Sequence, residues 1–390
     1  MKLHPKHAIL SAVIALALGG TLIGDAAAQS SRRGDKKQQK TEVLFPEASR
    51  QEPGLKTSSK NSKKVQQLIE AYNKQEWDKV RPLGDELLAL ENANAYEKSL
   101  GAQLAAQAAY DQDDNAAARK YLQQAIELNG LDNNSHYQSM LMLAQLHIMD
   151  DEYAPGLAML DRYLSESKST KPDDLALKGQ TLYQMERYQD AIPVLQGIVT
   201  GTPEPKDNWV QLLLACYAEA GKTTEALALA EQLAAKKPDD KKTQMLLATA
   251  YSQAEQDQKA AAVLEKLRAS GQLSEDREYR QLYITYANME GREKDVIAVI
   301  NEGIQKGVLK EDQQTYLALA QSYYYSDQIP QAIANWEKAA PLSKDGQTYY
   351  NLAVVLQQEG RIAEAKAAAQ KALDKGLKSP EQARRILQSK

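Results

Sequence analysis

A helix-pair pattern returns about every 34 residues from residue 64 to the end of the chain. Between residues 213 and 267, four pairs of like residues stand 34 apart: Leu213/Leu247, Tyr217/Tyr251, Ala226/Ala260 and Leu233/Leu267. A fixed period of this length is typical of stacked repeats, in which each unit buries its apolar face against its neighbours. The pattern predicts an all-α solenoid, an architecture whose extended surface usually binds other molecules.

Within one copy, large apolar residues recur at helical spacing, a short turn follows, and a second amphipathic stretch completes the copy. A small residue marks each stretch, which predicts two antiparallel helices that approach closely. In the first stretch these residues are Ala106, Ala144, Gly179, Ala248, Ala320 and Ala353. In the second they are Val80, Ala118, Gly156, Ala191, Ala226, Ala260, Val296, Ala332 and Ala365.

The chain resembles the tetratricopeptide repeat (TPR) family, whose pattern is a large residue, Leu, a small residue and Tyr, followed by Ala and a bulky residue. The clearest copy is Tyr316, Leu319, Ala320, Tyr323, Ala332, Trp336 and Ala339. The resemblance covers residues 64–378 and implies a superhelical solenoid of about nine antiparallel helix pairs. It departs from the pattern at Val80 and Pro82, and around residues 277–310, where a loop is one residue too long.

After the last repeat, Ser379-Pro380-Glu381 has the pattern of a helix N-cap followed by Pro at the first helical position. We therefore expect residues 379–390 to form a capping helix with a polar outer face, which the end of a solenoid needs.

Residues 1–28 have the features of a secretory signal peptide: Lys2 and Lys6, a short apolar run, and Ala26-Ala27-Ala28 before the cleavage point. The alternative, a transmembrane anchor, is disfavoured because the apolar run falls short of the ~20 residues that a span needs. We expect the mature chain to be exported, into the periplasm if the source is Gram-negative.

Residues 29–63 are rich in Ser, Lys, Gln and Pro, which predicts a disordered basic arm. The arm holds the only Phe, Phe45, in a short apolar patch. The patch is a solvated linker element, or it docks on a partner or on the first repeats; the sequence leaves these alternatives open. Because the repeats are acidic overall, nucleic acid is not expected to be a partner.

The sequence shows no motif for catalysis, a cofactor or a metal ion. Cys216 is the single cysteine and is read as a buried core residue. His136 and His147 have no metal-ligand spacing, and His147 is expected in a helix-packing position. Acidic pairs lie in or beside the predicted turns, where they cap helix N-termini more readily than they act as acid and base: Asp113-Asp114, Asp150-Asp151, Asp173-Asp174 and Asp239-Asp240. The chain is predicted not to be an enzyme.

In this family the inner face is formed by the residue after the small one and by the residue three further along. The first column reads Gln107, Gln145, Gln180, Thr249 and Gln321, and the second reads Tyr110, Ile148, Tyr183, Ser252 and Tyr324. Amide groups and rigid amphipathic rings suit an extended peptide, so we expect a protein or peptide partner here. The alternative is that these side chains only cover a solvent-exposed helix face and bind no partner.

Several local strings resemble exported gammaproteobacterial TPR proteins encoded beside TonB energy-transduction genes: residues 45–50, 92–145, 127–134 and 275–283. The resemblance implies an accessory role in TonB-dependent outer-membrane transport, with TonB-system components as partners. Our first hypothesis is a periplasmic, non-enzymatic adaptor. The second is a scaffold or chaperone for outer-membrane or polysaccharide-export machinery, capable of self-association.

Overall fold

The computed structural model describes residues 42–54 and 56–389 of the chain. Over these residues it contains nineteen helices and no strand, which confirms the predicted all-α class. The chain divides into two compact units, Met1–Gly221 and Lys222–Lys390. The predicted leader, residues 1–28, and the first part of the predicted arm lie outside the described residues.

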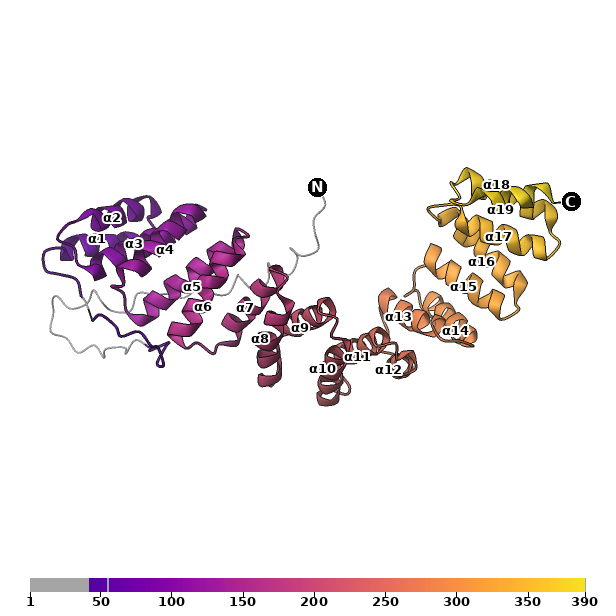
Figure 1. Ribbon diagram of the computed structural model, residues 1–390, viewed down its shortest axis with the longest axis horizontal. Helices are drawn as coiled ribbons and strands as arrows, with labels where there is room; N and C mark the ends of the chain where they lie inside the picture. The colour runs from indigo at the N-terminus through magenta and orange to yellow at the C-terminus, as the bar shows by residue number, and fades with distance from the viewer. Residues whose placement is uncertain (1–41, 55, 390) are drawn as a thin grey trace. The chain divides into compact units, whose positions relative to one another are not determined.

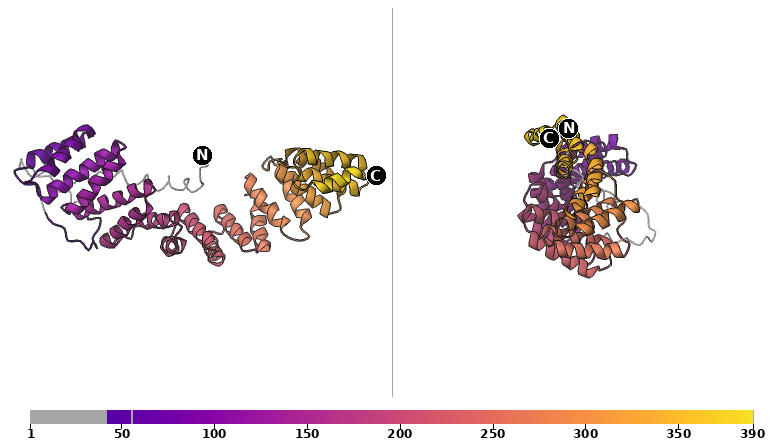
Figure 2. Two further views of the ribbon diagram at one scale, coloured as in Figure 1. Left: turned by 45° about the horizontal axis from the view of Figure 1, so that its top comes forward. Right: turned by 90° about the vertical axis from the view of Figure 1, so that its right-hand side faces the viewer.

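Unit 1 contains four complete helix pairs and one further helix, stacked in chain order (Figures 1 and 2). Each helix packs mainly on the helices next to it in sequence. The helices are α1 (Ser62–Asn73), α2 (Trp77–Ala89), α3 (Ala95–Asp111), α4 (Asn115–Leu128), α5 (Asn133–Met149), α6 (Tyr153–Ser167), α7 (Pro172–Gln184), α8 (Tyr188–Gly201) and α9 (Asp207–Glu219).

Unit 2 begins with one helix, continues with four complete pairs, and ends in the predicted capping helix. The helices are α10 (Thr223–Lys236), α11 (Lys241–Gln253), α12 (Asp257–Ala269), α13 (Asp276–Ala287), α14 (Glu293–Gln305), α15 (Gln313–Tyr325), α16 (Ile329–Leu342), α17 (Gln347–Gln358), α18 (Ile362–Asp374) and α19 (Pro380–Gln388). Pro380 opens α19 as expected, but the side chain of Ser379 makes no cap hydrogen bond. Ala383 and Ile386 bury the inner face of α19 against the last pair.

Small residues set the distance between packed helices. A Cβ atom built on Gly179 of α7 would lie 2.5 Å from Cδ2 of Leu195 in α8. Neighbouring pairs also approach closely at α2 and α3, where a Cβ on Gly84 would lie 2.7 Å from the carbonyl oxygen of Gly101. Since backbone faces backbone there, a side chain at Gly84 cannot be accommodated by a rotamer change.

The turn inside each pair reverses the chain through one residue of positive φ. Glycine supplies it at Gly221, Gly291 and Gly360, and other residues supply it at Gln75, Asp113, Asp151, Glu186, Glu255 and Asp327. The left-handed conformation ends the first helix and starts the reversal. Eight of these turns contain three residues between the helices, whereas the α13–α14 connection contains five, residues 288–292. Part of this difference is the earlier end of α13. From Tyr283 to Val296 the chain counts 13 residues, against 12 from Ala320 to Ala332, so the predicted excess of one residue is confirmed.

The arm differs from the expected disorder over the part that the structure describes. Residues 42–54 run beside the ends of α5 and α6 (Figure 1), and the exposed fraction of Phe45 is only 5%. Phe45 belongs to the same apolar cluster as Tyr137 of α5 and Tyr163 of α6. One aromatic side chain thus secures a segment whose composition alone predicts no structure, and the docked alternative is the one the structure adopts.

We predict that Gly84→Ala lowers the free energy of unfolding by about 1–3 kcal/mol, the usual cost of overpacking. The matched control is Gly197→Ala in α8, where nothing lies within 4 Å of the added Cβ. That change should raise stability by about 0.5–1 kcal/mol because alanine favours the helix. Urea denaturation followed by circular dichroism measures both. Equal effects of the two substitutions would contradict the close approach of α2 and α3.

Candidate protein-binding face

The first predicted column is exposed only in unit 2. Thr249 of α11 and Gln321 of α15 are exposed, whereas Gln107 and Gln145 in unit 1 are half-buried. Gln107 Nε2 donates to Asp111 Oδ2 at 2.8 Å within its own helix. Gln180 is only 3% exposed, so it offers no surface to a partner, and its assignment to the binding face is corrected.

The second predicted column contributes to packing within the helix pairs. Ile148 is 1% exposed and contacts Gly156 of α6, and Tyr110 packs on the unit 1 core. The Tyr183 ring meets Tyr188 of α8 at 5.4 Å between centroids. The reason is geometric: a residue one turn after the small residue points toward the second helix of its own pair.

In unit 2 the same column is partly used by the fold. The Tyr324 ring lies 5.6 Å from Trp336 of α16, and its hydroxyl donates to Gln358 Oε1 of α17 at 3.2 Å. Ser252 is half-buried, and its Oγ is shielded from solvent. Partner contact by Tyr110, Tyr183, Ser252 and Tyr324 stays a prediction, because no partner chain is present.

Two large apolar side chains on first helices are exposed, and the sequence reading missed both. Tyr325 at the end of α15 is 74% exposed, and Ile284 of α13 is 39% exposed. Tyr283 stands where other copies have a small residue, so Ile284, which follows it, belongs to the first predicted column. The longer connection after α13 obscured this alignment in the sequence. Exposed large apolar side chains that gather on one surface mark interaction sites more often than chance.

Polar groups accompany these apolar side chains. Gln281 Nε2 of α13 donates to Thr249 Oγ1 of α11 at 3.0 Å, which joins two first helices of successive pairs. Ile284 lies one turn after Gln281, so the two share one side of α13. Tyr325 lies one turn after Gln321, so these two share one side of α15. We call these residues the unit 2 first-helix face: Thr249, Gln281, Ile284, Gln321 and Tyr325.

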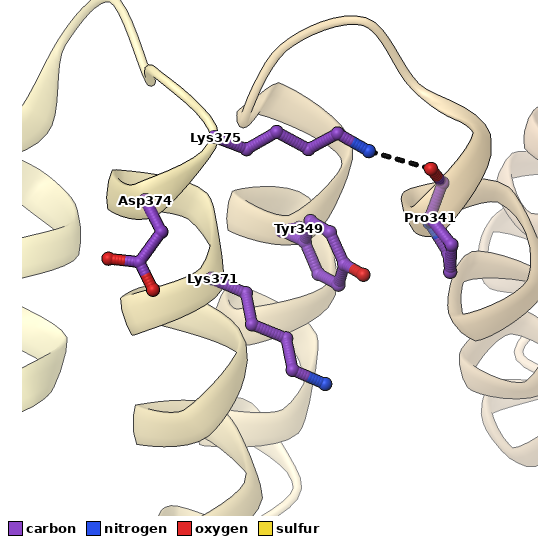
Figure 3. Close-up of a pocket in the computed structure, with 5 residues that line it drawn as sticks. All are labelled: Pro341, Tyr349, Lys371, Asp374 and Lys375. Atoms are coloured by element: carbon purple, nitrogen blue, oxygen red, sulfur yellow. Dashed lines mark hydrogen bonds between the residues drawn. The ribbon is translucent and has the colours of Figure 1, made fainter.

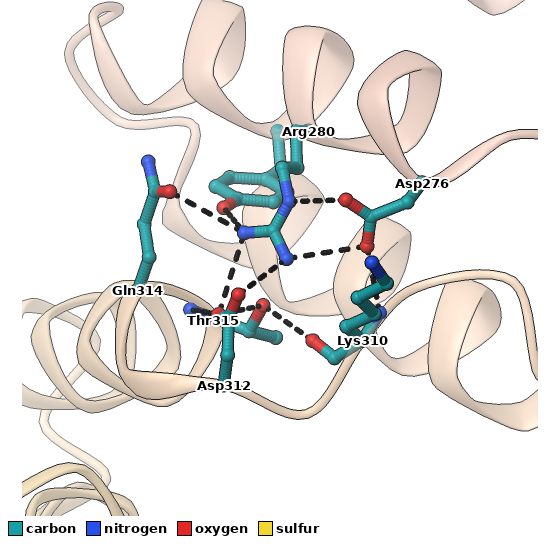
Figure 4. Close-up of polar contacts among 7 residues, drawn as sticks. Asp276, Arg280, Lys310, Asp312, Gln314 and Thr315 are labelled. Atoms are coloured by element: carbon teal, nitrogen blue, oxygen red, sulfur yellow. Dashed lines mark hydrogen bonds and ion pairs between the residues drawn. The ribbon is translucent and has the colours of Figure 1, made fainter. Parts of the chain in front are cut away.

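An arginine holds α13 and α15 in register beside this face (Figure 4). Arg280 Nε lies 2.6 Å from Asp276 Oδ2, and its Nη2 lies 2.8 Å from Asp312 Oδ2. Asp312 is also the N-cap of α15, where it accepts a hydrogen bond from the Thr315 backbone. The hydrogen bond to Asp276 raises the pKa of Arg280 above its ordinary value. The guanidinium therefore stays charged and ties one helix start to the next.

A second ionic group couples α12 to α14. Glu302 of α14 accepts hydrogen bonds from Arg268 Nε at 2.8 Å, Lys306 Nζ at 2.7 Å and the Tyr279 hydroxyl at 2.9 Å. Burial by itself would raise the pKa of Glu302, but these donors outweigh burial and hold the pKa at about 2. The carboxylate is thus charged over the whole range in which unfolded glutamate titrates.

A hollow of about 410 Å³ lies between α16, α17 and α18 (Figure 3). Lys375 Nζ donates to the carbonyl oxygens of Ala340 at 3.1 Å and Pro341 at 2.7 Å, at the end of α16. Lys371 and Lys375 also lie 5.7 and 5.6 Å from the Tyr349 ring centroid. Lys375 therefore satisfies the terminal carbonyl groups of a helix, a structural role.

The acidic pairs divide between capping and other structural roles. Asp114 and Asp240 accept the backbone N–H groups that begin α4 and α11, as predicted. Asp151 instead lies in the turn after α5, and Asp174 accepts the hydroxyls of Tyr163 and Ser169, both at 2.6 Å. Among residues 42–54 and 56–389, no group of three or more acidic, histidine or cysteine side chains is placed to hold a metal ion.

Cys216 and the two histidines fit core and surface packing. Cys216 is fully buried, as predicted, and burial raises the pKa of its thiol to about 12. His136 is 1% exposed, and burial together with the charge of Arg50 lowers its pKa to about 4. His147 packs beside Gly156 of α6, as expected of a helix-packing position, and its half-buried ring lies 2.6 Å from Glu152 Oε2. None of the helices that the structure describes is long and apolar enough to span a bilayer.

Comparison with known families identifies the repeats. Residues 104–172, 217–283 and 346–374 match family profiles described as tetratricopeptide repeat. With the nineteen helices of the described residues and the close contacts at the small residues, these matches show that the chain contains tetratricopeptide repeats in an all-α solenoid. TPR proteins are typically scaffolds that bind other proteins or peptides. No curated protein matches the sequence.

Solved structures with similar folds share little sequence with this chain. A TPR protein from Parabacteroides merdae is 12% identical, with a TM-score of 0.39 over 67% of this chain and 99% of that one. The C-terminal part of a TPR protein from Cytophaga hutchinsonii is 12% identical, with a TM-score of 0.42 over 72% and 95%. YrrB, described as a TPR protein with an unusual peptide-binding site, is 19% identical, with a TM-score of 0.35 over 43% and 84%.

We predict that Glu302→Gln lowers stability at pH 7 by about 1–3 kcal/mol, because it weakens three charge-assisted hydrogen bonds. The folded pKa of about 2 is depressed below the unfolded value near ~4.3, so the carboxylate stabilises the fold above pH ~4.3 and loses this effect as the pH falls toward 2. The stability gap between wild type and variant should therefore shrink between pH 7 and pH 3.

Urea denaturation at the two pH values measures the gap. The control is Glu290→Gln, at an exposed position in the α13–α14 connection, which should show no gap at either pH. A gap for Glu302→Gln that is the same at pH 7 and pH 3 would contradict the ionic role of Glu302.

Proposed function

We propose that this protein is a non-enzymatic adaptor that binds a segment of a partner protein on the unit 2 first-helix face. The observation that carries the proposal is the exposure of Tyr325 and Ile284, 74% and 39%, on helices whose other large apolar residues are buried or half-buried. The Tyr325 ring meets that of its neighbour Tyr324 at 5.5 Å between centroids, and most of its surface faces solvent. Covering it with a partner is favourable by roughly 25 cal/mol per Å² of apolar surface.

The surroundings of the two side chains define the partner's chemistry. Gln321 on α15 and the Gln281–Thr249 pair present amide and hydroxyl groups, which donate to and accept from a peptide backbone. The aromatic ring of Tyr325 supplies rigid contact area at low entropic cost. A partner segment with one or two large apolar side chains and free backbone hydrogen-bonding groups fits this face.

The cellular setting is proposed from the sequence. The leader pattern of residues 1–28 supports export, and the periplasm is the compartment we propose. The local strings that resemble TPR proteins encoded beside TonB genes support an accessory role in TonB-dependent transport, with TonB-system components as candidate partners. The alternative, a scaffold for outer-membrane or polysaccharide-export machinery, would use the same face for assembly.

Photocrosslinking in cells tests the face directly. We expect a photoreactive residue at position 325 to capture one defined partner, identified by mass spectrometry. The control is position 342. Leu342 is also a large apolar side chain, 53% exposed, but it lies at the end of α16, the second helix of its pair. Equal capture at both positions, or none at 325, would contradict the assignment.

The double change Ile284→Ser and Tyr325→Ser should weaken binding of that partner about tenfold or more, as expected for loss of apolar contact at two interface positions. Stability should change by no more than about 0.5 kcal/mol, because both side chains are exposed. Leu342→Ser should leave both quantities unchanged. Binding is measured by isothermal titration and stability by urea denaturation; unchanged affinity in the double variant would exclude this face.

Export is tested separately. If the leader is cleaved after Ala28, intact-mass analysis of the protein from its native host will show a chain that starts at Gln29. A chain that still carries residues 1–28 in the membrane fraction would favour an anchored form and overturn the periplasmic proposal.

A further inference from the structure

The edge of unit 1 formed by the ends of α4 to α7 holds residues 42–54 in the way that a binding site holds a peptide ligand. Asn134 of α5 clamps the backbone with its amide: its Oδ1 accepts from Leu44 N at 2.9 Å, and its Nδ2 donates to Glu42 O at 2.7 Å. Five residues after Leu44, Ser49 N donates to Glu166 O near the end of α6 at 2.8 Å. These contacts hold the backbone on both sides of a turn at Pro46 and Glu47, which Ala48 N closes by donating to Phe45 O at 3.3 Å.

A pocket on the same edge receives one aromatic side chain. The ring of Phe45 lies edge-on to Tyr137 of α5 at 5.1 Å and to Tyr163 of α6 at 6.0 Å between centroids. The ammonium group of Lys171, just before α7, lies 5.2 Å from the centre of the Phe45 ring. Both tyrosines are themselves almost fully buried, so the pocket is lined by fixed side chains.

Five residues after Phe45, the guanidinium of Arg50 is bound by uncharged acceptors. Its Nε donates to Asn129 Oδ1 at 2.7 Å, its Nη1 donates to Asn133 Oδ1 at 2.7 Å, and its Nη2 donates to Leu131 O at 2.8 Å and Asn129 O at 3.1 Å. Burial lowers the pKa of Arg50. The fork geometry of guanidinium suits this set of acceptors, whereas lysine would not reach them together.

The covalent link between this segment and the first helix is open. Residues 51–54 are exposed, and nothing lies within 4 Å of a Cβ built on Gly54. The next anchor is the carbonyl oxygen of Lys56, which accepts from Asn94 Nδ2 at 2.9 Å. Asn133 binds the segment up to Glu52: its N donates to Glu52 Oε1 at 2.8 Å and its Nδ2 donates to Arg50 O at 3.1 Å. Recognition thus resides in Phe45, Arg50, Glu52 and the backbone of residues 42–50, while the link between Glu52 and Lys56 supplies proximity.

We propose that this edge is an exchangeable peptide-binding site whose second occupant is residues 42–54 of another copy of the chain. The contacts within one chain and between two chains are the same, so two copies that trade arms form a closed pair with both sites filled. Covalent linkage gives the resident arm an effective concentration on the order of millimolar. The isolated chain at micromolar concentration is therefore monomeric, and a shorter link or high local concentration shifts it to the arm-exchanged dimer.

The experiment shortens the link in the otherwise unchanged chain. Deletion of Pro53 and Gly54 halves the reach between Glu52 and Lys56, from about 14 Å to about 7 Å at full extension. We expect light scattering after size exclusion to show more than about half of this variant as dimer at ~50 µM, where the full-length chain stays monomeric. Insertion of two glycines after Gly54 is the matched control and should leave a monomer.

Two further measurements identify the contact that holds the dimer. Phe45→Ala in the deletion background should return the protein to monomer, and a synthetic peptide of residues 42–54 should do the same, whereas that peptide with Phe45→Ala should not. A deletion variant that is folded by circular dichroism and remains monomeric overturns the proposal. So does a dimer that neither Phe45→Ala nor the peptide dissociates. Because unit 2 takes no part, these outcomes are independent of partner binding at the unit 2 first-helix face.

Discussion

The close approach of helices at small residues is the constraint on which the rest of this structure depends. Where Gly84 of α2 faces Gly101 of α3, and Gly179 of α7 faces Leu195 of α8, there is no room for one further carbon atom. Interhelical distance fixes how each pair sits on the next, and this sets which side chains remain outside. In unit 2 a Cβ built on Gly303 of α14 would lie 3.0 Å from Cδ1 of Tyr279, so α13 is held closely with Ile284 on its exposed side.

The same period that made the fold predictable limited the prediction of the binding face. Spacing identifies which residues repeat, and the eight complete helix pairs follow from it directly, whereas α19 follows from the Ser379-Pro380-Glu381 signal. It does not reveal whether a repeated residue faces a ligand or the second helix of its own pair. Ile148 and Tyr183 occupy one position in successive copies, and both pack within their pairs. Gln180 has the right spacing and is buried.

Where the repeat is irregular, prediction from the sequence was weaker still, although the irregular copies carry the ionic groups around Arg280 and Glu302. The copy that holds α13 and α14 has one extra residue, and Tyr283 stands in place of a small residue. The Tyr283 hydroxyl lies 3.2 Å from Arg280 Nη1, within the network that holds α15 to α13. This bulky residue is accommodated because an ion pair, and not only close packing, joins these repeats. Ile284, the next residue, is exposed, and the repeat pattern did not predict this exposure.

The docked arm changes how unit 1 should respond to local unfolding. In a simple repeat array each pair touches only its neighbours, so pairs are lost one at a time from an end. The arm contacts Asn94 at the start of α3, Asn134 on α5 and Glu166 at the end of α6, and Phe45 lies against Lys171 just before α7. It therefore bridges three successive pairs with one segment. Opening any one of these pairs costs contacts made by the others, so cooperativity in unit 1 extends beyond nearest neighbours as long as Phe45 stays in its pocket.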